Sequence, residues 1–154
     1  MTFQHILVPV DDSDISQAAI KQAIQMAKAF NSKITAVCVI AVDPFVGVDF
    51  YNVTPVITEY FIQAEAHAKK VLARIESICA QAGIASENRI IKGEPTETGI
   101  VHVAHEIGAD LIVIGSHGRT GLKKLMLGSV AQDVLNKTHI PVLVGRIQAA
   151  SATV

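Results

Sequence analysis

The sequence predicts an α/β fold: an open five-stranded parallel sheet flanked by helices, arranged as a Rossmann-like three-layer sandwich. Five short apolar runs recur along the chain. Most are continuous rather than alternating, which is typical of strands buried on both faces of a parallel sheet. Segments with the spacing of amphipathic helices separate these runs, so the predicted order is β-α-β-α-β-α-β-α-β with right-handed crossovers.

The five apolar runs are the predicted strands, and they comprise Ile6–Val10, Ile34–Val42, Arg89–Lys92, Leu111–Ile114 and Pro141–Val144. Proline has no N–H to donate within a sheet, so Pro141 suggests that the last strand lies at an edge or an end. The flavodoxin-like strand order 3-2-1-4-5 is one of two common orders for such a pattern. It would place the ends of the first and fourth strands side by side.

Four apolar stripes mark the predicted helices. They comprise Ala19, Ala23, Met26 and Phe30; Val71, Ile75, Ile78 and Ala82; Ile100, Val103, Ala104 and Ile107; and Leu127, Val130, Ala131 and Val134. Asp12 or Ser13 can cap the first helix, and Gly83 can end the second. Pro95 stands where the third helix should begin. The fourth is expected to begin near Leu125 or Gly128.

Composition sets further limits. The chain of 154 residues is half hydrophobic, which suits one domain over residues 1–147 with a loose tail over 148–154. A net charge of −1 argues against a general nucleic-acid partner, although it allows a local anion site. There is no signal-like N-terminus and no apolar run long enough for a membrane span. Cys38 and Cys79 are isolated, as reduced core cysteines are. We therefore expect a cytoplasmic protein without membrane insertion.

One region lacks a regular pattern, from Asp43 to about Tyr60. Five of the seven aromatic residues lie between Phe45 and Phe61. This segment is either a long connection that covers a sheet edge or the second helix, or a lid or partner-binding surface.

Two strand ends are chemically rich. The first predicted strand leads into Asp11 and Asp12, and the fourth leads into a glycine-rich stretch, GSHGRTGLKKLMLGS, over residues 115–129. Ligands of open α/β sheets bind beyond the carboxyl ends of the strands, where neighbouring connections diverge. If the two strands are adjacent, both features face one crevice.

The glycine-rich stretch has the chemistry of a phosphate nest. Gly115 and Gly118 let backbone N–H groups approach an anion closely, and the start of the fourth helix adds free N–H donors. Ser129 offers a hydroxyl and Arg119 a cation, while His117 either approaches a phosphate or packs within the loop. The alternative is that the glycines only form turns, with Lys123 and Lys124 on a solvated helix face.

The familiar nucleotide fingerprints are missing. Neither G-x-x-x-x-G-K-[ST] nor a G-x-G-x-x-G after the first strand occurs, which disfavours a P-loop kinase and a dinucleotide dehydrogenase. His102 and His105 lie three apart with no evident third ligand, so a solvated helix face is favoured over a metal site.

The spacing Gly115-x2-Gly118-x9-Gly128-Ser129 resembles the G-2x-G-9x-G-[ST] signature of the ATP-binding universal stress proteins. The similarity runs from ILVPVDDS through GEP and LIVIGSHGRTGL to GSVAQDVL and IPVLVGR, essentially the whole chain. The aromatic segment over residues 43–60 is the main departure from a short member of that family.

The resemblance implies roles for individual positions. Asp11, which follows Pro9 and Val10, matches an acidic residue near the ribose and phosphates, and Val39 matches the position whose backbone reads the adenine edge. The other matching positions lie near the ribose and phosphates or in the turn that grips the phosphates: Gly115, Gly118, Gly128, Ser129 and Val130.

The resemblance also implies ATP as ligand, with Mg²⁺ or Mn²⁺ held mainly by the phosphates, and a homodimer formed through the last strand around Ile140–Val144. The leading hypothesis is thus a dimeric, nucleotide-dependent regulator in the stress response, with ADP and AMP as alternative ligands. The runner-up is a nucleotide-independent dimeric module for an unknown protein partner. A slow ATP-hydrolysing or phosphotransfer protein is the third. A single carboxylate, Asp11, more often tunes binding than catalyses phosphoryl transfer, so we expect no enzyme.

Overall fold

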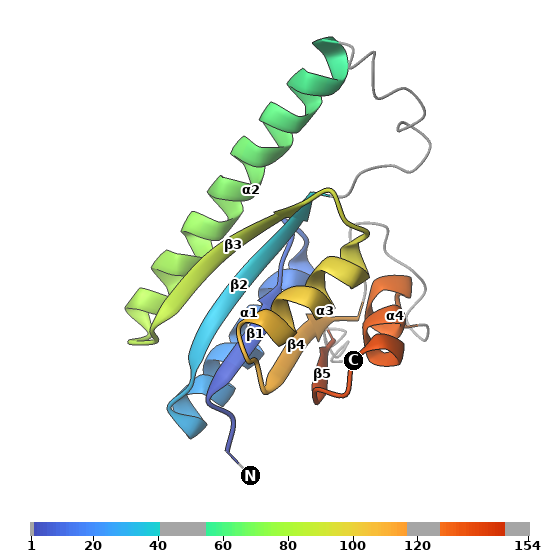
Figure 1. The fold of residues 1–154 in the computed structure, drawn as a ribbon. Coiled ribbons are helices and arrows are strands. Elements are labelled where there is room, and N and C mark those ends of the chain that lie inside the picture. Colours follow the sequence, from blue (N-terminus) through green and yellow to red (C-terminus); the bar gives the residue numbers. More distant parts are fainter. Residues whose placement is uncertain (1, 41–54, 117–126, 147–154) are drawn as a thin grey trace, which may run out of the picture.

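A computed structural model describes residues 2–40, 55–116 and 127–146, except for the side chains of residues 55–57. Strands and helices alternate in the predicted order (Figure 1). The elements are β1 (His5–Pro9), α1 (Asp14–Phe30), β2 (Lys33–Ile40), α2 (Pro55–Gln81), β3 (Ser86–Lys92), α3 (Thr96–Glu106), β4 (Leu111–Gly115), α4 (Ser129–Lys137) and β5 (Val142–Gly145).

The sheet has five parallel strands in the order β3-β2-β1-β4-β5, which confirms the predicted topology. Strand β1 is central, pairing with β2 on one side and with β4 on the other. Its alignment with β4 sets Ile6 opposite Leu111 and Leu7 opposite Ile112. Strand β5 lies at an edge, as Pro141 suggested.

Alternate side chains of each central strand enter different cores. Ile6 and Val8 of β1 pack into a cluster with α1 and α2, whereas Leu7 packs into a cluster with α3 and α4. Two helices therefore cover each face, which produces three layers (Figure 1). The helices change faces between the β1 and β4 connections, and this is the switch point at which such sheets bind ligands.

Three predicted helix ends, at the start of α1, the end of α2 and the start of α3, agree with the structure. Ser13 is the N-cap of α1, and its Oγ accepts a hydrogen bond from the Ser16 N–H at 3.2 Å. Helix α2 ends two residues before Gly83, which has a φ of +74° that favours glycine. Pro95 is the residue just before α3, where its missing N–H costs nothing.

Several boundary predictions need correction, including β2, which begins one residue early at Lys33, and β4, which ends one residue late at Gly115. Strand β3 begins at Ser86, three residues before the predicted Arg89, because an edge strand tolerates the exposed and partly exposed polar residues that precede its apolar run. Strands β1 and β5 are each displaced by one residue from the predicted Ile6–Val10 and Pro141–Val144. Helix α4 begins at Ser129, later than either predicted start.

Helix α2 also differs from the prediction. It begins at Pro55, so the last part of the segment predicted to be irregular is helical. Ile78, placed on the apolar stripe by its spacing, is 37% exposed. Of the predicted second strand, Val42 lies outside the described residues, as do the aromatic residues Phe45 and Phe50.

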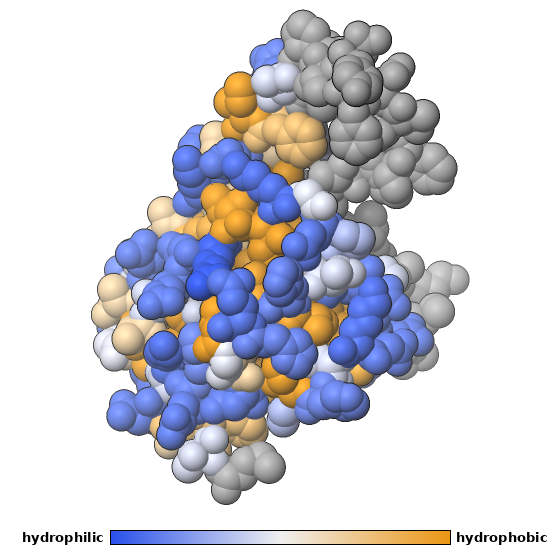
Figure 2. Space-filling model, viewed as in Figure 1, coloured by the Kyte–Doolittle hydropathy of each residue, from blue (hydrophilic) through white to orange (hydrophobic). Residues whose placement is uncertain are grey.

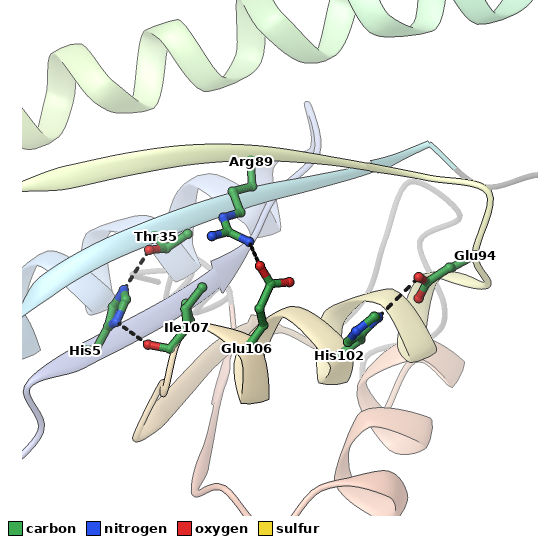
Figure 3. A network of polar contacts seen from close by, with 7 residues as sticks. All are labelled: His5, Thr35, Arg89, Glu94, His102, Glu106 and Ile107. Carbon is green, nitrogen blue, oxygen red and sulfur yellow. Dashed lines mark hydrogen bonds and ion pairs between the residues drawn. The ribbon is translucent and has the colours of Figure 1, made fainter.

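Polar contacts connect the layers on the α3 side of the sheet (Figure 3). Arg89 of β3 forms an ion pair with Glu106 of α3 at 2.8 Å, and this hydrogen bond lowers the pKa of the Glu106 carboxyl. At the amino end of β1, the buried His5 ring lies 2.7 Å from the Thr35 hydroxyl and 3.2 Å from the Ile107 carbonyl. The amino end of the sheet is thus closed by internal hydrogen bonds.

Candidate functional site

A crevice of about 970 Å³ lies at the opposite, carboxyl end of the sheet. It is bordered by the residues that follow β1, by the ends of β2 and β4, by one face of α2 and by the first residues of α3 and α4. The predicted switch point between β1 and β4 therefore coincides with a real cavity.

All eight predicted site residues that the structure describes line this crevice. They are Pro9, Val10, Asp11, Val39, Gly115, Gly128, Ser129 and Val130. Three more predicted residues, His117, Gly118 and Arg119, lie outside the described residues, as do Lys123 and Lys124.

The turn after β1 has a fixed geometry. The Asp11 carboxylate Oδ1 accepts a hydrogen bond from the Ser13 N–H at 2.8 Å, and the Asp11 N–H donates to the Ser16 Oγ at 2.8 Å. Val10 continues the pairing with β2, since its N–H donates to the Val37 carbonyl at 2.8 Å. These bonds hold the Asp11 carboxylate at the crevice wall. The contact with Ser13 uses Oδ1 and does not involve Oδ2.

The connection from β4 to α4 brings backbone donors to the crevice. The Ser116 N–H donates to the Gly145 carbonyl at 2.8 Å, and the Gly128 N–H donates to the Ser116 carbonyl at 2.6 Å, which positions the start of α4 beside the end of β4. Gly128 is the N-cap and makes no side-chain cap hydrogen bond. The N–H groups of the first helical turn have no partner within the helix, and they carry the positive end of its dipole.

Helix α2 supplies a wall that the sequence analysis did not predict. Its crevice-lining residues are Tyr60, Gln63, Ala64, His67, Ala68 and Val71, and their spacing of three and four places them on one helix face. His67 Nε2 lies 3.1 Å from the Asp12 Oδ2, which joins this wall to the turn after β1. The spacing of three and four residues is visible in the sequence, but the predicted apolar stripe of this helix starts only at Val71.

The charged side chains of the described crevice wall are acidic, namely Asp11 and Asp12. The positive contribution of the described wall comes from the backbone amides at the start of α4. Within residues 2–40, 55–116 and 127–146, no three His, Cys, Asp or Glu side chains are grouped so that they could hold a metal ion.

Of the remaining histidine and cysteine candidates, only Cys38 among the described residues borders the crevice. His102 and His105 are exposed on α3, as predicted, and His102 Nδ1 lies 3.3 Å from the Glu94 carboxylate (Figure 3). Cys79 is buried in the core, and burial raises the pKa of its thiol. Cys38 is partly buried and lines the crevice. None of the described helices is both long and apolar enough to cross a membrane.

Comparison with known proteins gives a consistent result. Residues 2–146 match the model of the universal stress protein family. Universal stress protein MJ0531 of Methanocaldococcus jannaschii is 35% identical over 142 residues, which cover 92% of this chain and 81% of that protein.

Solved structures share the fold. The hypothetical protein MJ0577 superposes with a TM-score of 0.83 at 27% identity, over 97% of this chain and all of that one. A universal stress protein in complex with cAMP gives 0.63 at 26% identity, over 96% of this chain and 100% of the other. The universal stress protein from Archaeoglobus fulgidus in complex with dAMP gives 0.67 at 25% identity, with coverages of 95% and 100%.

Proposed function

The chain belongs to the universal stress protein family, and on this premise we propose that its crevice binds ATP and that the protein is a nucleotide-dependent regulator in the stress response. ADP and AMP are alternative ligands of the same site. We further propose that it acts in the cytoplasm as a homodimer formed through the edge strand, around Ile140–Val144.

One observation carries the nucleotide proposal: the described positions that the family resemblance implies for nucleotide binding, although they range from Pro9 to Val130 in sequence, meet in one crevice. The site unites Asp11 after β1 with Gly128 and Ser129 at the start of α4. Its volume of about 970 Å³ lies within the range of small-molecule sites. Two relatives of known structure hold the adenine nucleotides cAMP and dAMP.

The chemistry of the walls suggests how such a ligand would lie. The start of α4 favours phosphate, because its free N–H groups and dipole attract anions. The end of β2, with Val39, lies on the far side of β1 and offers an apolar surface suited to a base. Asp11 lies between them, where it would meet the ribose and phosphates.

A divalent ion fits this arrangement. The Asp11 and Asp12 carboxylates would repel bare phosphates, whereas Mg²⁺ or Mn²⁺ bound to the phosphates would offset that repulsion. When bound, the ion supplies positive charge between the phosphates and the protein. We expect the phosphates to provide most of its ligands, with Asp11 as the protein group nearest to it.

We do not propose an enzyme. Phosphoryl transfer needs a group that orients the nucleophile and a preorganised charge stabiliser. Among the described residues the candidate is Asp11, whose Oδ1 already accepts the Ser13 N–H. We therefore expect at most very slow ATP hydrolysis.

Calorimetric titration with ATP in the presence of Mg²⁺ tests the proposal. The informative variant is Gly128→Val, which adds a branched side chain to the crevice wall where α4 begins. Gln132→Val is the matched control, because it introduces the same residue at an exposed position of the same helix that does not line the crevice.

We expect micromolar binding to the wild-type protein, little change in Gln132→Val, and a loss of at least about tenfold in Gly128→Val, equivalent to about 1.4 kcal/mol. Circular dichroism establishes that both variants fold. Absence of binding by wild-type protein freed of co-purified nucleotide would contradict the proposal. It would favour the nucleotide-independent interaction module instead.

A further inference from the structure

Helix α2 is longer than its packing requires. Its 27 residues extend about 40 Å at 1.5 Å per residue, whereas the eight residues of β2 extend about 27 Å. The helix therefore continues past the carboxyl end of the sheet (Figure 1). Its buried residues run from Ala68 to Cys79, and none of residues 58–67 is buried. Packing in the core does not explain this first half.

The extended half nevertheless has a distinctive face. Tyr60, Gln63 and His67 follow one another at helical spacing and line the crevice together. The contact between His67 and Asp12, 3.1 Å long, fastens this face to the turn after β1. The Gln63 amide donates to Glu59 at 3.3 Å. The face thus forms a side wall of the crevice that also contains the end of β2.

Tyr60 is the aromatic residue of that wall. Its side chain is 60% exposed although it borders a cavity, and its ring meets the Phe61 ring edge-on, with centroids 5.6 Å apart and planes at 71°. Hydrophobic side chains lie exposed on the extending part of the helix (Figure 2). An aromatic ring at the edge of a ligand crevice offers a flat, polarisable surface, on which the bases of nucleotides stack.

We propose that Tyr60 is a ligand-binding residue that stacks on the base of the bound nucleotide, with the α2 face of Tyr60, Gln63 and His67 forming the base-side wall of the crevice. This inference rests on the proposed function. It assigns the base to the β2 and α2 end of the crevice and the phosphates to the β4 and α4 end. Tyr60 then contributes to the recognition of nucleosides but not of phosphate.

The test compares two ligands on three variants. Titration with ATP reports on the whole crevice, and titration with inorganic tripolyphosphate reports on its phosphate end alone. Tyr60→Ala removes the ring, and Tyr60→Phe keeps it. Ile62→Ala is the matched control, because Ile62 is 63% exposed on the same turn but does not line the crevice.

We expect Tyr60→Ala to weaken ATP binding about fivefold or more, the range given by removal of one stacking aromatic. Tripolyphosphate binding should be unchanged, and Tyr60→Phe and Ile62→Ala should bind both ligands as the wild type does. Because Tyr60 is largely exposed, its truncation should leave the thermal midpoint nearly unchanged.

The experiment distinguishes a failure of the Tyr60 proposal from a failure of the nucleotide proposal. If the wild type binds ATP and Tyr60→Ala binds it equally well, the role of Tyr60 is overturned and the nucleotide proposal stands. If Tyr60→Ala weakens ATP and tripolyphosphate by the same factor, the assignment of the base to the α2 wall is overturned. If the wild type binds no ATP, both proposals fall together.

Discussion

At the residue scale, His5 shows how burial sets the charge of a side chain. The ring is 5% exposed and contacts the Thr35 hydroxyl and the Ile107 carbonyl. A carbonyl only accepts hydrogen bonds, so Nδ1 carries the proton and Nε2 accepts from Thr35. Burial, aided by Lys33, lowers the pKa of His5 below its usual 6.5. The Ile107 carbonyl and the carboxylates of Glu87 and Asp110 oppose this shift without reversing it.

The lowered pKa predicts a loss of stability in mild acid. The unfolded chain takes up a proton on His5 at a higher pH than the folded chain does. The free energy of unfolding therefore falls as the pH drops below about 6.5 and through the folded pKa. Denaturant titrations at about pH 7.5 and about pH 5.5 measure this change. We expect His5→Gln to reduce it, and His105→Gln, on an exposed face, to leave it as in the wild type. Equal pH dependence in wild type and His5→Gln would exclude this role for His5.

Some residues of the crevice could be predicted from the sequence, and others could not. Gly115 and Gly128 were predictable because they belong to a spaced signature, and Asp11 because it directly follows the first predicted strand. Tyr60 and His67 were not, because their role depends on where a helix begins. Thr54 and Pro55 have the residue types of an N-cap and a first helical position, but they stand in the segment interpreted as irregular, so the periodicity was not extended back from Val71.

At the element scale, α3 packs unusually close to β3. A Cβ on Gly99 of α3 would lie 2.9 Å from Ile91 Cγ2 and 3.4 Å from Ile91 Cδ1. Alanine in a helix interior is favoured over glycine by about 1 kcal/mol, whereas overpacking a core typically costs about 1–3 kcal/mol. Because Cγ2 is attached to the branched Cβ and cannot rotate away freely, we expect the clash to prevail.

Gly99→Ala should therefore destabilise the protein by about 1 kcal/mol. Ile91→Leu removes the carbon at the γ2 position while preserving volume, so the effect of Gly99→Ala should shrink or change sign in that background. Unfolding titrations of the wild type, both single variants and the double variant give the coupling energy directly. If Gly99→Ala stabilises the protein in the wild-type background, the Ile91 side chain moves to accommodate the added Cβ and the expected clash does not occur.

Some boundaries of helices and strands could be predicted from the sequence and others could not. The start of α1 at Ser13 and the end of α2 near Gly83 were predicted because each depends on one local residue. The start of β3 at Ser86 was missed because an edge strand need not be continuously apolar. Such a strand is defined by its pairing with β2, which a local apolar pattern does not reveal.

At the scale of the whole molecule, the strand order was predictable in advance as one of two common orders. The apolar runs indicated a parallel sheet, and the two chemically rich strand ends favoured the order that makes them neighbours. Oligomeric state is a further property of the whole molecule. The edge strand β5 carries Leu143, 36% exposed, which makes it the surface expected to pair with a second copy.

Leu143→Lys should shift the protein from dimer to monomer, because two like charges would meet where the edges pair. We expect the dissociation constant of the dimer to rise at least about tenfold, equivalent to about 1.4 kcal/mol. Sedimentation velocity over a concentration series measures it. Leu135→Lys, at a residue of α4 that is 42% exposed, is the control and should remain dimeric. A wild-type protein that is monomeric at all concentrations would refute the β5 interface.

The pairing of β1 with β4 also determines when the crevice comes into being during synthesis. Residues 5–12 leave the ribosome before residues 111–131, which supply the β4 and α4 walls of the crevice. A nascent or truncated chain that ends before this point has an unpaired edge on β1 and half a binding site. A nucleotide that binds only the completed crevice stabilises finished chains and offers nothing to fragments. If the crevice binds a nucleotide as proposed, the ligand would therefore add stability to a chain only after β4 and the start of α4 are in place.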